Sequence, residues 1–400
     1  MVQSTPSRWR EETIGEIVEF HDHRRIPISE IERSSRRGPY PYYGASGIID
    51  FIDGFIFDGN YLLVSEDGEN LKSRKTPIAF MASGKFWVNN HAHILAARAD
   101  VATNYFLMSF IENSNLSGYI TGTAQPKLSQ ANLKRIRVHL PSIAIQRKIT
   151  AVLCAYDNLI ENDLRRIEII SQMADRVFTE WFVKFRFPGN DSASLVHSAT
   201  GTIPRGWTFA NLFDVAEVTY GFPFRADRFS SAGGTGVTRI RDLIQGETFT
   251  YTTERVDDRY VVQNGDILLG MDGNFNLHIW TGGEAYLNQR VARFRPREGI
   301  SPYYLLLALK RPIHFFDSTV VGTTVAHLSD EDLKSINIPV PDPEVSRLAM
   351  ASFDQLFKLE LSLRLRNVVL RKTRDLLLPK LISGELDVSD LDIKVEDDKL

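Results

Sequence analysis

Two long stretches of the chain carry apolar residues at helical spacing, and each follows a segment with the pattern of short strands. Residues 42–64 and 260–295 alternate apolar and polar positions, or run apolar for a few residues, between Gly and Asp-Gly turns, which is typical of strands. After Pro141 and again after Pro341 the apolar spacing becomes three and four residues over several heptads. A period near 3.5 predicts helices that pair as a coiled coil.

Each predicted helix has its own start signal and apolar stripe. Ser142 is suited to cap the first helix, and Asp342-Pro343-Glu344 gives the second an N-cap, a first-turn proline and an acid. At about 38 residues, each would be roughly 57 Å long, which favours a spacer over an ordinary core helix. The expected stripes are Ile145, Ile149, Val152, Tyr156 and Leu159, then, after a one-residue slip, Ile160, Leu164, Ile167, Ser171, Ala174, Phe178 and Trp181; and in the second helix Val345, Ala349, Ser352, Leu356, Leu359, Leu363, Arg366, Leu370, Thr373 and Leu377.

The chain is an internal duplication at an offset of 200 residues. Residues 121–141 and 321–341 share eight identities in 21 positions, against about one or two expected by chance. Between the matching segments the two copies differ, which indicates one scaffold that presents two different surfaces. Further matches are Trp9 with Trp207, Gly59–Leu63 with Gly265–Leu269, and His93-Ile94 with Arg290-Val291.

These patterns predict an α+β fold. We expect two β-rich mixed domains in a pseudo-two-fold arrangement, separated by two long antiparallel coiled-coil helices. The expected boundaries are 1–141 for the first domain, 142–187 for the first helix, 188–206 for a linker, 207–341 for the second domain, 342–384 for the second helix and 385–400 for an acidic tail.

Charge and cysteine content narrow the function classes. The formal net charge is −3, and residues 385–400 hold seven acids against two lysines, so any DNA binding must use local positive charge. Cys154 is the one cysteine, which excludes an internal disulfide and cysteine-rich metal sites and fits a small buried side chain. The chain has no apolar N-terminal segment and no run of about 18 apolar residues, so we expect a cytoplasmic protein without a signal peptide or membrane span.

The sequence shows none of the motifs of bond-making chemistry that we considered. It lacks the [DNS]-P-P-[FYW] box of amino-methyltransferases and the G-x-x-x-x-G-K-[ST] phosphate loop. Gly44–Gly47 has too few glycines for a cofactor loop. His91 and His93 lie at strand spacing, but further metal ligands are not found at a recognisable spacing. We therefore expect a non-enzymatic chain that holds neither a metal nor a cofactor.

Several segments carry residue types that suit contact with DNA. Asn pairs with adenine, Arg and Lys reach guanine or phosphate, and aromatic rings pack on bases; hydroxyls beside glycine suit phosphate. Each residue taken alone is equally well a solvated surface side chain, but the set favours recognition. The first-copy candidates are Arg36, Tyr40, Tyr42, Tyr43, Ser46, Lys85, Trp87, Asn89, Asn90, His91, His93, Thr123, Gln125 and Lys127, with Arg33 and Arg37 in the same segment. The second-copy candidates are Tyr220, Arg225, Arg228, Arg239, Arg241, Asn274, Asn276, His278, Gln289, Arg290, Thr323, Thr324 and His327.

A further set of segments carries a resemblance to a known family: Tyr42–Ile49, Phe57–Gly59, Thr121–Gln125, Leu140-Pro141 with Gln146–Ile149, Trp181–Val183, Gly265–Leu268, Arg374–Leu381 and Ser383–Glu385. On these segments the chain resembles the DNA-specificity (S) subunit of type I restriction-modification systems, over nearly its whole length. The second copy departs from the first at residues 344–347, where a counterpart of Gln146 is missing.

The resemblance implies a division of labour. Each globular domain would be a target-recognition domain for one half of a bipartite, asymmetric site in double-stranded DNA. The paired helices would set the unread gap and dock two methyltransferase (M) subunits, which bring S-adenosylmethionine and methylate adenine N6. Restriction (R) subunits would bring ATP and Mg for translocation and cleavage.

Two other function classes stay open at this point. The chain could be a self-contained methyltransferase or nuclease with an unrecognised site, which titration with S-adenosylmethionine would reveal. It could also be a protein scaffold whose coiled coil is the function. Loss of sequence-specific methylation on exchange of residues 1–140 would exclude the scaffold.

Overall fold

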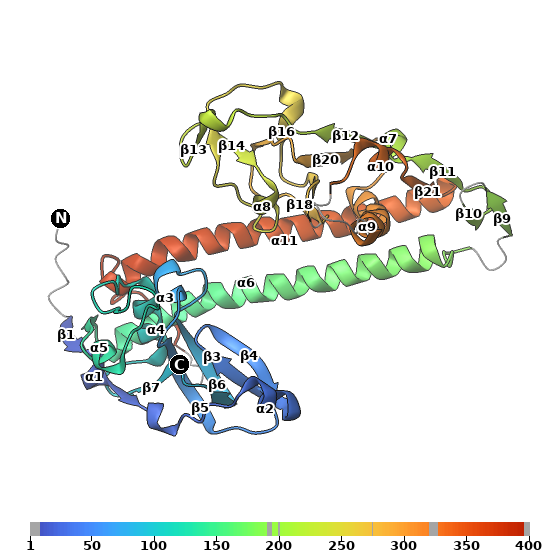
Figure 1. Cartoon of the computed structure of the whole chain (residues 1–400). Helices are drawn as coiled ribbons and strands as arrows, with labels where there is room; N and C mark the ends of the chain where they lie inside the picture. The colour runs from blue at the N-terminus through green and yellow to red at the C-terminus, as the bar shows by residue number, and fades with distance from the viewer. Residues whose placement is uncertain (1–8, 190–193, 199–200, 274, 320–326, 396–400) are drawn as a thin grey trace. The chain divides into compact units, whose positions relative to one another are not determined.

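The chain divides into two compact units. The computed structural model describes residues 9–189, 194–198, 201–273, 275–319 and 327–395. Unit 1 comprises Met1–Leu159 and Leu370–Leu400, and unit 2 comprises Ile160–Val369. Two long helices, α6 (Ile143–Phe178) and α11 (Pro343–Ser383), contribute residues to both units (Figure 1).

Unit 1 contains a six-stranded mixed sheet and a separate two-stranded sheet, with short helices around them. Its strands are β1 (Arg10–Thr13), β2 (Val18–Phe20), β3 (Arg37–Gly44), β4 (Gly47–Ile52), β5 (Phe57–Ser65), β6 (Ala79–Val88), β7 (Ala92–Ala97) and β8 (Arg137–Leu140). Its helices, besides the shared ones, are α1 (Ile14–Ile17), the 3-10 turn η1 (Asp22–Arg24), α2 (Glu30–Ser35), α3 (Asn70–Ser73), α4 (Asn104–Asn113) and α5 (Gln130–Lys134). The strand order is β2-β7-β5-β6-β3-β4, with β3 and β6 parallel and the other pairs antiparallel, while β1 pairs with β8.

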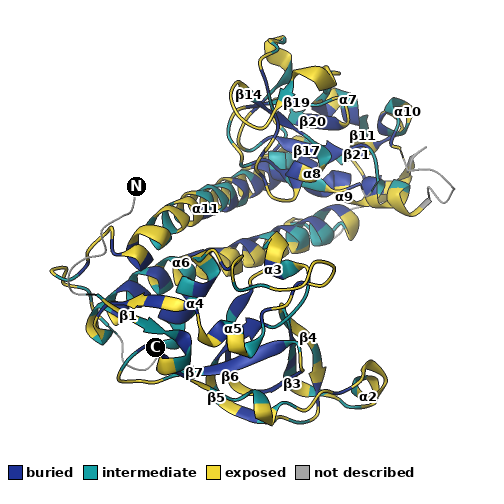
Figure 2. Cartoon of the chain, turned by 60° about the vertical axis from the view of Figure 1, so that its left-hand side comes forward, coloured by how far each residue is buried: buried dark blue, intermediate teal, exposed yellow. Residues whose placement is uncertain are grey.

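The later part of the central strand β5, Tyr61–Val64, is a continuous apolar run because both faces of the sheet are covered there. Leu62 and Val64 lie in one buried cluster with α1 and α4, whereas Leu63 lies in another with Phe57 and Phe86. Alternate side chains of a strand point to opposite faces, so the run Leu62–Val64 supplies two cores at once. Figure 2 shows β7 mostly buried and α2 mostly exposed.

Unit 2 contains a four-stranded sheet, a five-stranded sheet and two two-stranded sheets. Its strands are β9 (Leu195–Ser198), β10 (Gly201–Pro204), β11 (Thr208–Asn211), β12 (Ala216–Tyr220), β13 (Phe229–Ser230), β14 (Thr235–Thr238), β15 (Tyr251–Thr252), β16 (Val261–Val262), β17 (Ile267–Gly270), β18 (Leu277–Ile279), β19 (Ala285–Leu287), β20 (Val291–Pro296) and β21 (Asn337–Val340). Its other helices are α7 (Leu212–Val215), η3 (Ala226–Arg228), α8 (Ile240–Leu243), η4 (Asp258–Tyr260), α9 (Pro302–Thr319) and α10 (Asp330–Lys334). The sheet orders are β12-β20-β17-β18 and β13-β15-β14-β19-β16, and β11 pairs with β21.

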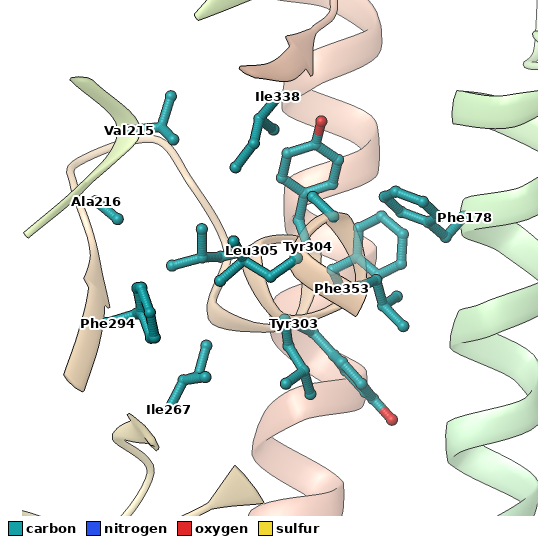
Figure 3. Packing of buried hydrophobic residues seen from close by; sticks show 14 of the residues in the cluster. Phe178, Val215, Ala216, Ile267, Phe294, Tyr303, Tyr304, Leu305, Ile338 and Phe353 are labelled. Atoms are coloured by element: carbon teal, nitrogen blue, oxygen red, sulfur yellow. The ribbon is translucent and has the colours of Figure 1, made fainter. Parts of the chain in front are cut away.

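The core of unit 2 joins its four-stranded sheet to three helices. Figure 3 shows Ile267 and Phe294 of the sheet on one side of Tyr303 and Tyr304 of α9, with Phe353 of α11 and Phe178 of α6 on the other. The Tyr304 ring lies 5.8 Å from Phe178 and 6.1 Å from Phe353, between centroids. The mixed α+β fold expected from the sequence is thus confirmed, with two repeats of one frame.

Both helix starts follow their sequence signals. The Asp342 side chain accepts hydrogen bonds from the amides of Glu344 and Val345, each at 3.1 Å, and α11 begins at Pro343. Helix α6 begins directly after Ser142. The predicted N-caps are therefore confirmed.

The predicted stripe on α6 is confirmed at Ile149, Ile160, Ile167, Ala174 and Phe178, which are buried, but it is wrong at positions between them. Leu159 and Leu164, both assigned to it, are 49% and 45% exposed. The observed stripe needs no slip, because two polar residues, Gln146 and Asp163, occupy fully buried positions in it. Its buried members are Gln146, Ile149, Leu153, Ile160, Asp163, Ile167, Ile170, Ala174 and Phe178.

The stripe on α11 also differs from the prediction. Ser352 and Leu359 are exposed, whereas Phe353, Phe357 and Glu360 are buried. From Val345 to Phe357 the buried positions advance in steps of four, because this part of α11 packs against α9 as an ordinary core helix.

Within each unit the segments of α6 and α11 run antiparallel. In unit 2, Arg366 bonds to Asp163 while Phe353 lies 6.1 Å from Phe182, between ring centroids. In unit 1, Nη1 of Arg374 donates to Asp157 at 2.7 Å, and Leu381 shares a buried cluster with Ile149 and Leu153 further toward the start of α6.

The end of the first helix also differs from the prediction. We expected the helix to continue to residue 187, but α6 ends at Phe178 and a π-helical turn, Thr179–Val183, follows. Phe182, Phe185 and Phe187 all pack on Trp207 with ring centroids 5.3 to 5.7 Å apart, which draws the chain off the helix axis. Within the segment expected to be a linker, β9 and β10 form a short hairpin.

Candidate nucleic-acid interface

In unit 1, Asp67 lies in the loop after β5 and contacts two other loops, the one that contains His91 and the one of residues 121–127. Its carboxylate lies 2.9 Å from Nδ1 of His91, and its backbone forms an isolated bridge with Lys127. His91 is half-exposed, and its neighbour Asn90 is exposed. These contacts bring together polar side chains that lie far apart in the sequence. We define the Asp67 cluster as Asp67, Asn90, His91, Thr123, Gln125 and Lys127.

The loop of residues 121–127 is fixed by its backbone. The amides of Thr121 and Lys127 donate to each other's carbonyl oxygens at 2.8 and 2.7 Å. Gly122 has φ +83°, and a Cβ there would lie 2.2 Å from the carbonyl oxygen of Gln125, so the turn requires glycine. The side chains of Thr123 and Gln125 remain exposed on this fixed backbone.

A network of largely buried, charged and polar side chains lies beneath the Asp67 cluster and supports it. The buried His93 ring lies 2.6 Å from Asp22 through Nδ1 and 2.8 Å from the Leu128 carbonyl oxygen through Nε2. Glu66 accepts from Arg25 at 2.6 Å and lies 3.2 Å from Nζ of Lys127. Burial alone would raise the pKa of Asp22, but its bonds to His93 and the Ile94 amide and the charge of Arg25 hold that pKa below its ordinary value.

Four of the residues predicted to contact DNA are buried, and the prediction is corrected at these positions. Tyr42 accepts from the Ile28 amide at 3.1 Å, and Trp87 donates to the Ile26 carbonyl oxygen at 2.6 Å. Asn89 accepts from the His91 amide at 2.8 Å. With His93, these side chains satisfy their polar atoms inside the protein and support the surface. The four buried residues are Tyr42, Trp87, Asn89 and His93.

A second exposed group in unit 1 combines two cations with two aromatic rings. Nζ of Lys85 lies 4.7 Å from the Phe55 ring centroid, and the Tyr40 and Phe55 rings are 5.1 Å apart. The Arg36 guanidinium lies 5.2 Å from the centroid of the Trp87 ring. Phe55 is 39% exposed. We define the Arg36 cluster as Arg36, Tyr40, Phe55 and Lys85.

The remaining first-copy candidates lie on β3, on α2 or in the β3–β4 turn. Ser46 is exposed in that turn. Tyr43 is half-buried against Phe80 and Phe86, and burial raises its pKa. Arg33 and Arg37 both pair with Asp50, at 3.3 and 2.9 Å.

In unit 2, Asp272 takes the central place that Asp67 has in unit 1. Its Oδ1 lies 2.6 Å from Nδ1 of His327, and its Oδ2 lies 3.4 Å from Nε of Arg290. Gln289, next to Arg290, is exposed, and the Tyr220 hydroxyl donates to Asp330 at 2.5 Å. Burial and this carboxylate raise the pKa of Tyr220. We define the Asp272 cluster as Asp272, Gln289, Arg290 and His327.

The other second-copy candidates are more scattered. Arg225 pairs with Asp227 at 3.0 Å, and the Arg239 guanidinium lies 5.8 Å from the Phe229 ring centroid. His278 is half-buried, and burial, with the charge of Arg364, lowers its pKa. Arg228, Arg241 and Asn276 are exposed. Three further candidates lie outside the described residues: Asn274, Thr323 and Thr324.

The two units build these clusters with the same backbone bonds. In unit 1 the Glu66 amide donates to the His91 carbonyl and the Leu128 amide to the Glu66 carbonyl, at 2.9 and 2.8 Å. In unit 2 the Met271 amide donates to Arg290 and the Leu328 amide to Met271, both at 2.9 Å. The equivalent pairs are Asp67 with Asp272, His91 with Arg290, and Lys127 with His327.

This equivalence corrects the sequence match that set His93 opposite Arg290. The two copies differ in length between their matching segments, and the structural equivalence is therefore displaced by two residues from the sequence match. A signal for the aspartates was present, since Asp67-Gly68 and Asp272-Gly273 each follow the central strand.

Comparison with protein families gives two matches to one family, the type I restriction modification DNA specificity domain. The matched residues are 6–171 and 204–371, which together cover most of the chain. The chain belongs to this family. Each specificity domain contains one of the repeated frames and extends into one of the long helices.

Individual relatives carry the same description. The chain is 26% identical to the specificity subunit of the type I restriction enzyme MjaIX of Methanocaldococcus jannaschii, over 82% of this chain and 80% of that protein. It is 23% identical to the MjaVIII specificity subunit of the same organism, over 96% and 95%. A putative type I specificity subunit of Haemophilus influenzae is 30% identical, but over 39% of this chain and only 38% of its own length.

The fold is that of a solved specificity subunit. The crystal structure of the S subunit of a type I restriction-modification system from M. genitalium matches with a TM-score of 0.63 at 16% sequence identity, over 95% of this chain and 97% of that one. In the residues described for the present chain, no helix is apolar enough over sufficient length to cross a membrane. Within the same residues, no three His, Cys, Asp or Glu side chains gather in a way that could hold a metal ion.

Proposed function

We propose that this chain reads a bipartite, asymmetric site in double-stranded DNA for a type I restriction-modification complex, with one half-site read by each unit. The observation that carries the proposal is that one backbone frame, built twice, presents different exposed side chains at equivalent positions. His91 in unit 1 corresponds to Arg290 in unit 2, and Lys127 corresponds to His327. Different side chains at the same place select different bases, so the two half-sites differ.

The contacts to DNA come from the exposed members of the predicted set. In unit 1 the Asp67 cluster supplies amide and cationic groups, and the Arg36 cluster supplies cations beside aromatic rings that can pack on bases or thymine methyl groups. In unit 2 the Asp272 cluster and the exposed arginines Arg225, Arg228 and Arg241 take these roles. Phosphate contacts by such cations position the protein, and contacts to base edges specify the sequence.

The long helices fix the unread gap and dock two methyltransferase subunits. Helix α6 has 36 residues and α11 has 41, which at 1.5 Å per residue is about 54 and 62 Å of helix. The proposed globular domains are 1–141 and 207–341, in a pseudo-two-fold arrangement about these helices. Exposed apolar side chains such as Ile169 and Met173 on α6 and Val369 on α11 give the helices surface suited to partners.

The bond chemistry belongs to the partners. We propose that the chain is not itself an enzyme and holds no cofactor, while the M subunits use S-adenosylmethionine to methylate adenine N6. Where R subunits join, they use ATP and Mg for translocation and cleavage. This assignment follows from the family and from the missing catalytic motifs.

The decisive experiment is a methylome. The chain would be expressed with its methyltransferase partner in a host free of adenine methylation, and N6-methyladenine mapped by long-read sequencing. The proposal expects one bipartite motif with modified adenines on opposite strands across a fixed gap. A stable complex with M that yields no motif would favour a scaffold, and S-adenosylmethionine bound by the isolated chain would favour an enzyme.

A further inference from the structure

Each unit carries an aspartate just after its central strand that was not among the residues predicted to contact DNA. Asp67 follows β5 and Asp272 follows β17, and both precede a glycine. Their side chains are 19% and 25% exposed. Both carboxylates are thus largely shielded from water while they adjoin exposed polar groups.

In unit 1 the Asp67 carboxylate contacts the imidazole of His91, and the Asp67 backbone holds the loop of residues 121–127. Oδ1 and Oδ2 lie 2.9 and 3.0 Å from Nδ1 of His91, whose side chain is 45% exposed. The backbone bridge to Lys127 and the bond from the Gly68 amide to the Pro126 carbonyl, at 3.0 Å, fasten the loop to the same residue. Asp67 therefore positions both the His91 ring and the loop of residues 121–127.

In unit 2 the Asp272 carboxylate contacts two side chains, a guanidinium and an imidazole. Arg290 and His327, whose side chains are 53% and 50% exposed, approach opposite oxygens of Asp272 at 3.4 and 2.6 Å. The backbone of Asp272 bridges His327, as that of Asp67 bridges Lys127. The same relationship is therefore built twice, with different side chains.

We infer that Asp67 and Asp272 are equivalent positioning residues, each of which orients the DNA-contacting side chains of its own half-site. This inference rests on the proposed function. A carboxylate in direct contact with DNA would be repelled by the phosphates, whereas a carboxylate that holds an exposed side chain in place reduces the conformational freedom which that side chain loses on binding. Asp67 acts through His91, and Asp272 acts through Arg290 and His327.

The inference is tested with Asp67→Asn and Asp272→Asn in the complete complex with the methyltransferase partner. Asparagine keeps the size of the side chain and leaves the backbone bridges in place, but removes the charge. Methylation is measured at the wild-type motif and at every single-base variant of each half. Glu11→Gln in unit 1, which removes the 2.7 Å pair with Arg137, and the exposed Glu298→Gln in unit 2 are matched controls.

Each variant is expected to change its own half-site alone. Asp67→Asn should raise methylation at single-base variants of one half about fivefold to tenfold relative to the wild-type motif, as for loss of a positioned base contact. Asp272→Asn should do the same at the other half. The gap length, the melting temperature of the complex and the two controls should stay as in the wild type.

A double-mutant cycle separates positioning from a general structural role. If Asp67 acts through His91, then Asp67→Asn should add little to the effect of His91→Ala, whereas independent residues would give multiplied effects. Asp67→Glu, which keeps the carboxylate, should restore most of the selectivity. The double-mutant cycle and the Asp67→Glu variant are both measured on assembled complex, so they can still be read if Asp67→Asn gives a low yield.

Three results would overturn the inference. Unchanged selectivity in both aspartate variants, with the wild-type motif present, would contradict the positioning role and leave the proposed function standing. An equal loss at both half-sites would identify a general structural role. Absence of any bipartite motif in the wild type would contradict the proposed function and the inference together.

Discussion

The carboxylate of Asp163 on α6 is fully buried, and Nε of Arg366 on α11 donates to it at 2.6 Å, while the Arg366 side chain is still 48% exposed. The two side chains of this ion pair thus differ in their exposure to solvent. A buried carboxylate without a counter-charge is strongly unfavourable, whereas a half-exposed guanidinium without its partner can turn to water.

This inequality predicts an asymmetric effect of mutation. Arg366→Met should lower the melting temperature of the chain more than Asp163→Asn does, because only the former leaves a buried charge unpaired. The double variant Asp163→Leu with Arg366→Leu should recover much of the loss. Thermal unfolding followed by circular dichroism measures all three, and an equal fall for both single variants would contradict this account of the pair.

The core of unit 2 predicts a large effect at Phe353. Its ring is fully buried against Phe182 and Tyr304, so Phe353→Ala should reduce the free energy of unfolding by about 3–5 kcal/mol. Phe249, which is 55% exposed, offers a control of the same residue type, and its change to alanine should cost about 0.5 kcal/mol or less. Denaturant unfolding gives both values.

The corrected interface predicts different consequences for two neighbouring residues. Asn90→Ala, at an exposed position, should weaken binding to one half-site by about 1–3 kcal/mol and leave stability unchanged. Trp87→Ala, at a buried position, should instead lower the free energy of unfolding by about 3–5 kcal/mol. Filter binding with each half-site mutated, together with denaturant unfolding, separates the two; a stable Trp87→Ala protein with altered base selectivity would restore the original prediction.

The lowered pKa of Asp22 predicts the pH dependence of stability in unit 1. A carboxylate whose pKa is lower in the folded than in the unfolded state stabilises the fold above its ordinary pKa, and this contribution is lost as the pH falls through the folded pKa. Asp22→Asn should therefore be less stable than the wild type near pH 7. The difference should shrink below about pH 4, as melting curves across that range would test.

The unbroken stripe on α6 predicts which insertions the helix pair tolerates. Seven residues added between Leu164 and Ile167, with seven between Leu363 and Arg366, keep the three-and-four spacing, because seven residues are two turns of a coiled coil. The complex should then methylate the same two half-sites across a longer gap. Four residues added to α6 alone would shift the stripe and should lower the yield of complex. A changed half-site sequence in the seven-residue variant would contradict the spacer role.

Sequence pattern was sufficient for the fold class, the duplication and the starts of both helices. These features depend on apolar periodicity and on capping residues such as Asp342, which act locally. The stripe registers were not predictable in this way, because Asp163 and Gln146 are polar and their burial depends on partners distant in the sequence.

The same reasoning explains the misplaced interface residues. Tyr42, Trp87, Asn89 and His93 have side chains that suit DNA, but all four are buried. The groups that satisfy the polar atoms of Tyr42, Trp87 and His93 come from distant segments, such as Asp22 for His93. Phe55 illustrates the opposite case, an apolar residue left at the surface beside Lys85. Residue type identifies what a side chain can bind, whereas burial decides whether that side chain is accessible at the protein surface.

The residue before each positioning aspartate limits how recognition loops can be exchanged between units. Glu66 accepts from Arg25 and pairs with Lys127, but Met271 stands at the equivalent place in unit 2. A loop of residues 121–127 grafted into unit 2 would set its lysine opposite a thioether that cannot accept a strong hydrogen bond. An engineered specificity with exchanged loops therefore has to carry the residue pair Glu66-Asp67 along with the loop, so the transferable module is a pair of segments.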